Sequence, residues 1–128
     1  MPYLLDTHVL IWWITADHRL STRAKSLIKS HRSIICWSVA SSWEVSIKYA
    51  LGRLAFEEPP ERLIPSELKR NQIETVTIRN RHAFLAGRLP VHHKDPFDRM
   101  LIAQARIESF GIISNDSKFK LYDGEVYW

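Results

Sequence analysis

The chain has 128 residues, with 18 Lys and Arg against 14 Asp and Glu, so its formal net charge is +4. This length suits one domain around one hydrophobic core, and we expect residues 1–128 to form it. The single cysteine excludes an internal disulfide bond, and no apolar stretch reaches the roughly 18 residues of a membrane span. With no signal-peptide pattern at the start of the sequence, these features predict a cytoplasmic protein without a membrane segment.

Strands and helices are expected to alternate along the chain. Short apolar runs predict strands at 3–5, 34–37, 73–76 and 112–114, with a last short stretch at 126–128. Helical patterns lie between them, over 9–14, 21–30, 38–51, 61–70, 79–88 and 95–110. Near-continuous apolar strands alternating with helices predict an α/β fold with a central, mostly parallel sheet of four to five short strands and helices on both sides.

Four acidic residues stand out in this pattern of strands and helices. Asp6 follows the first strand, Asp116 follows the 112–114 strand, Asp98 lies in the first turn of the last long helix, and Glu44 lies inside the helix that begins after Ser38. Groups just past the carboxyl ends of parallel strands converge on one crevice. Carboxylates that meet there repel one another unless a cation lies between them, and oxygen ligands favour Mg²⁺ or Mn²⁺.

Each acid also has a structural interpretation. Asp6 can cap the 9–14 helix, Glu44 can pair with Lys48 one turn later, Asp98 can form a capping box with Asp95, and Asp116 can belong to a turn. These interpretations require four separate coincidences, whereas one metal site accounts for all four acids.

Glu44 is the most informative of the four. It falls on the same helical stripe as Ala40, Ile47 and Leu51, so we expect all of them to point toward packed surface. Burying a carboxylate is costly without a partner, and a shared cation would be that partner.

The charge balance is compatible with a polyanionic substrate. If the four acids hold a cation, the remaining 10 acidic residues face 18 basic ones, which leaves a basic surface around an acidic hole. A modest positive charge also occurs in proteins where it serves only solubility. The run His92-His93-Lys94 is interpreted as basic surface near the site, with Lys48 and Arg99 as further candidates for gripping a phosphate backbone.

Several segments resemble one family in order and spacing. They are Leu4-Leu5-Asp6-Thr7-His8, Ser41 to Lys48, His92 to Ala105 and Ser114 to Phe119. With these segments the chain resembles the PIN-domain ribonucleases, and within them the VapC toxins of bacterial toxin–antitoxin pairs. One departure is His8, which stands where many relatives have Asn or Ser.

The resemblance implies a PIN-like fold and an endoribonuclease that needs Mg²⁺ or Mn²⁺ to cut RNA phosphodiester bonds. It assigns the catalytic and metal-binding roles to Asp6, Glu44, Asp98 and Asp116, of which Asp6 and Asp98 would bind the ion directly. It also implies a cognate VapB-like antitoxin that lies across the toxin, and a homodimer. Trp12, Trp13, Trp43 and the helices flanking Pro59-Pro60 are candidates for either contact surface.

Two other functions are compatible with the residues. One is a phosphatase in which Asp6 attacks phosphate, although such enzymes want a further acid about two residues later, where His8 stands. The other is a non-catalytic module that binds nucleic acid or protein through its acids.

Overall fold

The computed structural model describes residues 2–122 and 124–128. Its strands are β1 (Pro2–Leu5), β2 (Ile34–Ser38), β3 (Glu74–Val76), β4 (Gly111–Ile113) and β5 (Val126–Tyr127). Its helices are α1 (Thr7–Ile14), α2 (Thr22–Lys29), α3 (Val39–Ala50), α4 (Pro60–Arg70), α5 (Asn80–Arg88) and α6 (Pro96–Glu108), with a 3₁₀ helix, η1, at Ser117–Tyr122. The predicted alternation of strands and helices is therefore confirmed.

The strands form one sheet in the order β3-β2-β1-β4-β5, and every pairing is parallel. The chain moves outward from β1 to β2 and β3, and later returns to the other side of β1 with β4. This reversal places a crevice beyond the carboxyl ends of β1 and β4. Because Leu5 pairs with Ile113, the residues that follow them, Asp6 and Ser114, leave the sheet side by side.

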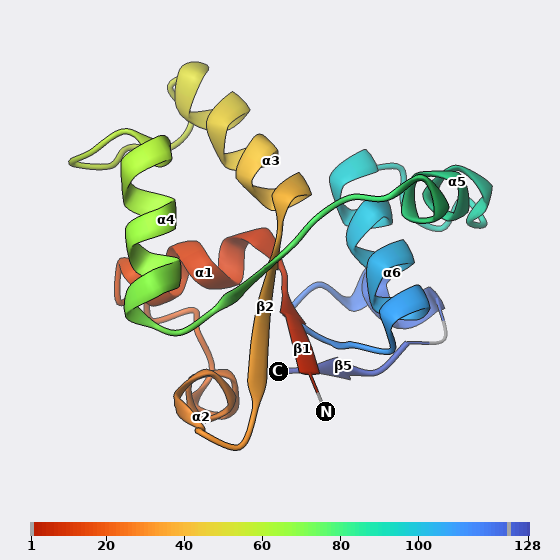
Figure 1. Ribbon diagram of the computed structural model, residues 1–128, viewed down its shortest axis with the longest axis horizontal. Helices are drawn as coiled ribbons and strands as arrows, with labels where there is room; N and C mark the ends of the chain where they lie inside the picture. The colour runs from red at the N-terminus through yellow and green to blue at the C-terminus, as the bar shows by residue number, and fades with distance from the viewer. Residues whose placement is uncertain (1, 123) are drawn as a thin grey trace.

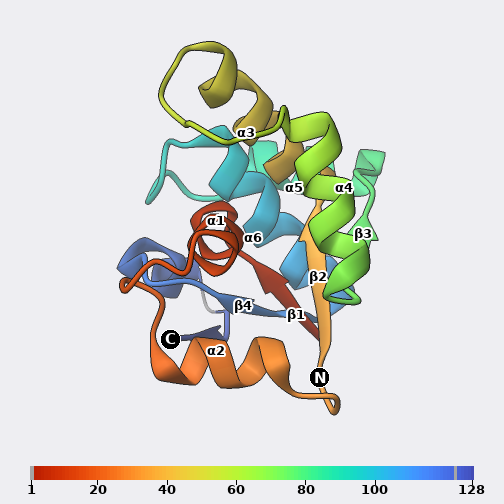
Figure 2. The ribbon, with the colours of Figure 1, turned by 90° about the vertical axis from the view of Figure 1, so that its left-hand side faces the viewer.

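Helices cover the two faces of this sheet (Figures 1 and 2). Successive residues of β1 point to opposite faces, so Leu5 packs with α1, α2 and α4, whereas Leu4 packs with α6 and η1. Cys36 belongs to the second cluster, while its neighbours Ile35 and Trp37 belong to the first. Strands buried on both faces explain the near-continuous apolar runs in the sequence.

The helix ends follow the predicted capping chemistry. Ser21 accepts a hydrogen bond from the Ala24 amide at 3.0 Å, and Ser38 accepts one from the Ala40 amide at 3.1 Å. Helix α6 ends two residues before the predicted Phe110, because Ser109 adopts a left-handed conformation with φ of 59°. Pro65 is accommodated within the second turn of α4.

The prediction that one stripe of α3 faces packed surface along its whole length is partly wrong. Glu44 and Ala40 are buried, but Ile47 and Leu51 are 37% and 63% exposed. The reason is that α3 starts at the end of β2 and continues away from the sheet, so its later turns leave the main core (Figure 1). Trp43, on a neighbouring position of the helix, is 62% exposed.

The Cys36 thiol is buried, as predicted, and burial raises its pKa to about 11. Such a thiol stays protonated at neutral pH and is a poor nucleophile. Among the described residues, no helix has both the length and the apolar character needed to cross a membrane.

Gly111 provides a test of the packing at β4. A Cβ at this position would lie 2.8 Å from Cε2 of Tyr127 and 3.1 Å from Cδ1 of Tyr3. We expect Gly111→Ala to lower the free energy of unfolding by about 1–3 kcal/mol through overpacking. Gly87→Ala is the matched control, because nothing lies within 4 Å of its added Cβ and Ala favours a helix interior. Urea unfolding of both variants measures the difference, and equal stabilities would contradict the packing described here.

Candidate functional site

A cavity of about 540 Å³ opens beyond the carboxyl ends of β1 and β4. It is lined by Asp6, His8, Trp12, Arg19, Glu44, Lys48, His93, Asp95, Asp98, Asn115 and Asp116. All four acids singled out in the sequence therefore lie in one place, although they come from the β1–α1 junction, α3, α6 and the segment after β4. We call this cavity the acidic pocket.

Asp6 occupies the N-cap position of α1, but its side chain does not have the predicted capping role. Its side chain makes no capping hydrogen bond, and its Oδ2 instead accepts a hydrogen bond from the Ser114 hydroxyl at 2.8 Å. The same Ser114 oxygen accepts from the amide of Asp116 at 3.0 Å, which ties the ends of β1 and β4 together. Asp6 is buried, and burial raises the pKa of its carboxyl against the opposing effect of the Ser114 hydrogen bond.

Glu44 is held by α3 with only 3% of its surface exposed. Its Oε2 accepts from the Lys48 ammonium at 2.5 Å, so the predicted i to i+4 pair does form. Its Oε1 is buried without a hydrogen-bond partner, and no other buried side-chain oxygen or nitrogen among the described residues shares this state. Lys48 therefore accounts for only one of the two carboxylate oxygens, and the other is open to a hydrogen-bond donor or a cation.

Asp95 and Asp98 have separate roles at the start of α6. Asp95 Oδ1 accepts from the amides of Phe97 at 2.9 Å and Asp98 at 3.2 Å, so Asp95 alone caps the helix. This frees the Asp98 carboxylate, which lines the acidic pocket. Burial, and then the charge of Asp6 and the other acids around it, raise the pKa of Asp98 to about 8.

Asp116 combines a turn role with a place in the pocket. Its Oδ1 accepts from the amide of Lys118 at 2.9 Å, as turn chemistry predicts. Its Oδ2 lies 3.6 Å from Nε2 of His93. Its side chain is 34% exposed, so it forms the open edge of the pocket.

Sequence reasoning placed two basic residues wrongly, His93 and Arg99. His93 was interpreted as basic surface, but it is buried, and its Nε2 lies 2.6 Å from Oδ2 of Asp98. Arg99 was expected to grip phosphate, but its guanidinium donates to backbone carbonyls, including those of Ala86 and Leu89. Lys94 is exposed, as predicted for basic surface, and it is not part of the lining of the acidic pocket.

Arg19 lines the acidic pocket and was missed. It lies in the loop after α1, where no motif marks it, and its guanidinium sits 4.9 Å from the ring centroid of Trp12. Its Nε and Nη2 donate to the two carboxylate oxygens of Asp17 at 3.0 and 2.8 Å. The signal that could have found it is the Asp17–Arg19 spacing, which favours a local bidentate pair in a loop.

The donor set fits a divalent cation. His93, Asp98 and Asp116 each offer a ligand atom, and these atoms all lie within 4.8 Å of one another. Glu44 adds an oxygen that is already desolvated and unpaired. Hard carboxylate oxygens are what Mg²⁺ and Mn²⁺ prefer, and a cation would relieve the repulsion that raises the pKa of Asp98.

The Asp98 carboxyl predicts how stability depends on pH without metal. Its pKa is about 8 in the folded protein but near 4 in an unfolded chain, so the folded state holds a proton that the unfolded state has lost. The free energy of unfolding should therefore fall as the pH rises from about 4 to about 8. Asp6, Glu44, Asp95, Asp116, Lys48 and His93 line the same pocket, so the effect of Asp98 is isolated by comparing the wild type with a variant at Asp98.

Asp98→Asn mimics the protonated carboxyl and should flatten this slope. Thermal midpoints measured in EDTA between about pH 5 and about pH 9 test it. The same pH dependence in the wild type and in Asp98→Asn would show that Asp98 ionises normally.

Known proteins resemble this chain in sequence and in fold. Residues 3–125 match the PIN domain family. Ribonuclease VapC16 of Mycobacterium tuberculosis (strain ATCC 25618 / H37Rv) is 32% identical over 69 residues, which cover 54% of this chain and 48% of that protein. The match thus spans about half the length of that relative.

Two solved structures share the fold over nearly the whole chain. The VapBC2 structure from Rickettsia felis, bound to a DNA fragment from their promoter, matches with a TM-score of 0.71 at 18% identity and covers 99% of this chain and 98% of that one. VapBC-1 from nontypeable Haemophilus influenzae matches with a TM-score of 0.67 at 17% identity, covering 99% and 97%. The family match across residues 3–125 and the all-parallel sheet with helices on both faces lead to the same conclusion: the chain belongs to the PIN domain family.

Proposed function

We propose that this protein is a metal-dependent endoribonuclease of the VapC type, the toxin of a toxin–antitoxin pair. Membership of the PIN domain family and the partial match to a protein named a ribonuclease support the activity. The observation that carries the proposal is the unpaired, buried Oε1 of Glu44 in a pocket formed by acids from four separate segments. Such an arrangement is unfavourable in a metal-free protein and becomes favourable with a cation.

Asp6 and Asp98 are the proposed direct ligands of Mg²⁺ or Mn²⁺, and Glu44 and Asp116 complete the set. Such an ion would supply Lewis-acid chemistry, by lowering the pKa of a nearby water and neutralising charge on the phosphate. Hydrolysis would add a water across a P–O bond, so that the phosphorus gains an oxygen from water and the leaving sugar oxygen takes up a proton. Ser114 orients Asp6 in this set through its 2.8 Å hydrogen bond.

Basic residues at the rim would bring RNA to the acids. Lys48 and Arg19 line the acidic pocket together with its carboxylates. Lys48 is fixed there by Glu44, and Arg19 by Asp17 and the face of Trp12. In this proposal both cations contact phosphates of the RNA backbone near the cleaved bond. An exposed, single-stranded RNA segment is the proposed substrate, because specific RNA recognition mainly targets such regions.

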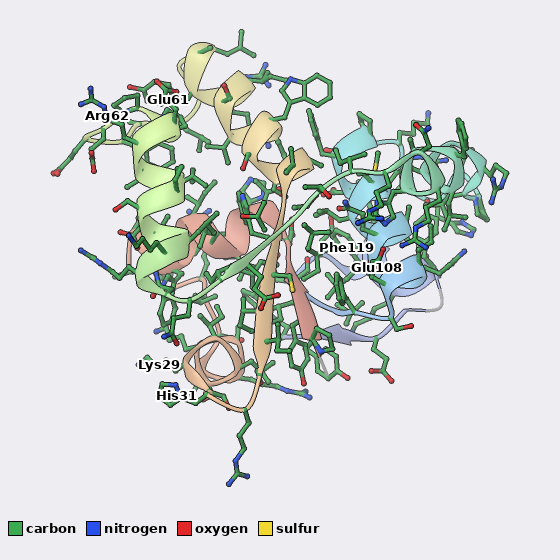
Figure 3. The ribbon with its side chains drawn as sticks, viewed as in Figure 1. Lys29, His31, Glu61, Arg62, Glu108 and Phe119 are labelled. Carbon is green, nitrogen blue, oxygen red and sulfur yellow. The ribbon has the colours of Figure 1, made fainter. Side chains whose placement is uncertain are left out.

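A VapB-like antitoxin is the proposed partner, because the solved relatives were determined as VapBC complexes. A cavity of about 600 Å³ lies between α3 and α4, and its lining is mostly apolar. It is lined by Ser42, Ser46, Pro60, Glu61, Ile64, Pro65, Leu68, Lys69, Ile73 and Thr75. Figure 3 labels Glu61 at the outer end of α4, beside this groove. We place an antitoxin segment there, next to the helix that begins at Pro60.

The tryptophans divide between core and surface. Trp12 is buried beside the acidic pocket, and Trp13 is half-buried with its indole N–H donating to Asn71 at 3.1 Å. Trp43 is the exposed one, and with Val39, Ile47 and Leu51 it forms a row of exposed apolar residues spaced four apart along α3. We call this row the α3 stripe and propose that it is the homodimer face, because a two-fold interface can pair the same stripe with itself.

We also propose that residues 1–128 act as one domain in the cytoplasm, where the lone Cys36 thiol would stay reduced.

The central test of activity is Asp6→Asn, which keeps the side-chain size and removes the charge. We expect cleavage of RNA in Mg²⁺ or Mn²⁺ to fall by at least about a hundredfold, since even residues that only support metal ligands commonly cost 10–100-fold. Glu44→Gln should also lose cleavage, because the neutral amide no longer offers a negative charge to the cation.

Glu57→Gln, an exposed acid, is the matched control and should cleave like the wild type. EDTA should stop cleavage by the wild type. Undiminished cleavage by Asp6→Asn, or cleavage that continues in EDTA, would remove the proposed mechanism, and a wild type that binds RNA without cutting it would favour the binding module.

Trp43→Arg tests the α3 stripe. A charge in the centre of a self-paired apolar face should shift the protein from dimer to monomer in sedimentation. Phe84→Arg is the control, because Phe84 is 65% exposed on α5, away from the stripe. An unchanged dimer in Trp43→Arg would show that the stripe is not the interface.

A further inference from the structure

His93 lies in the acidic pocket but is not one of the four acids proposed to bind the metal. Its ring is buried, with Nε2 2.6 Å from Oδ2 of Asp98 and 3.6 Å from Oδ2 of Asp116. The ring packs edge-on against Phe119, which Figure 3 labels near α6, at a centroid distance of 6.3 Å. The imidazole is therefore fixed between an apolar side chain and the carboxylate that would bind the metal.

The backbone around His93 is anchored by two side chains. Tyr122 Oη accepts hydrogen bonds from the amides of His93 at 2.7 Å and His92 at 3.1 Å, and donates to the Pro90 carbonyl at 2.7 Å. Arg99 donates to the His93 carbonyl at 3.1 Å. Both polar backbone groups of His93 are thus held, which fixes the direction of its side chain. Arg99, wrongly expected to grip phosphate, serves instead to shape this loop.

The contacts of the two ring nitrogens favour a hydrogen bond over metal ligation. The amide of Asp95 donates a long, 3.5 Å hydrogen bond to Nδ1, and this contact suits the tautomer that carries its proton on Nε2, next to Asp98. Two ligand atoms on neighbouring corners of an octahedral ion lie roughly 3.0 Å apart, given metal–oxygen distances of about 2.1 Å. The observed 2.6 Å is shorter than this and is typical of a hydrogen bond to a carboxylate.

We propose that His93 is a positioning residue that holds Oδ2 of Asp98 through Nε2–H, leaving the other carboxylate oxygen of Asp98 for the ion. This inference rests on the proposed metal-dependent function. Side chains that hydrogen-bond a metal ligand fix its rotamer and prepare the site before the ion arrives. His93 would do so for the acid whose own helix position, at the start of α6, leaves its side chain free to rotate once Asp95 takes over the capping.

The test measures Mn²⁺ affinity by calorimetry, independently of cleavage. His93→Ala should weaken binding about 10- to 100-fold. His93→Gln can place an amide N–H where Nε2 was, so its affinity should stay much closer to the wild type than to His93→Ala. His92→Ala is the matched control for metal binding, because its neighbouring ring is exposed and contacts Tyr122 rather than the acids. Equal affinities of the wild type and His93→Ala would overturn the proposal.

A second pair of variants separates loss of the hydrogen bond from a general loss of stability. His93→Asn and His93→Gln are both amides, but the Asn side chain is too short to reach Asp98, so only Gln should rescue affinity. If His93→Asn and His93→Gln bind Mn²⁺ with equal affinity, His93 does not act through a hydrogen bond to Asp98.

A spectroscopic measurement separates positioning from ligation. Pulsed electron paramagnetic resonance of bound Mn²⁺ should show no directly coordinated ¹⁴N in the wild type. A nitrogen coupling that disappears in His93→Ala would make His93 a ligand and overturn the positioning role. A wild type that binds no Mn²⁺ at all would contradict the metal site and with it the proposed function. A wild type that binds Mn²⁺ as tightly as His93→Ala does would contradict only the role of His93.

Discussion

The structure depends on the burial of like charges at one point. Asp6, Glu44 and Asp98 reach the same pocket, where burial raises the pKa of Asp6 and of Asp98 and one oxygen of Glu44 has no partner. A folded protein retains such repulsion only if something compensates for it. Lys48 and Ser114 compensate in part, each through one carboxylate oxygen. A divalent ion would compensate for the rest, which links the stability of the pocket to its proposed chemistry.

The topology of the sheet makes this convergence possible. Because β1 lies in the centre with β2 on one side and β4 on the other, the chain leaves β1 and β4 at the same crevice. Helix α3 begins at the carboxyl end of β2, and α6 begins after the loop that carries His93, so both bring an acid to the same opening. The amino-terminal end of α6 also favours a nearby negative charge. The fold of this domain therefore brings the four acids together.

The sequence was sufficient for the fold class and for the placement of the four acids near one another, because strand ends in a parallel sheet share an edge. It was insufficient where the outcome depended on packing between distant segments. The outward direction of Ile47 and Leu51 depends on where α3 leaves the core, and periodicity along the helix does not contain that information. The inward direction of His93 depends on Tyr122 and Arg99, which anchor its backbone from other segments. Arg99 illustrates the same limit, since a basic residue beside an acid motif can bind carbonyls as readily as phosphate.

The most direct measurement is anomalous X-ray scattering from a crystal of this protein grown with Mn²⁺. We expect one or two anomalous peaks inside the acidic pocket, within about 2.2 Å of carboxylate oxygens of Asp6 and Asp98. Peaks only at exposed surface acids, with the pocket empty at saturating Mn²⁺, would contradict the claim that these buried charges exist to hold a metal ion.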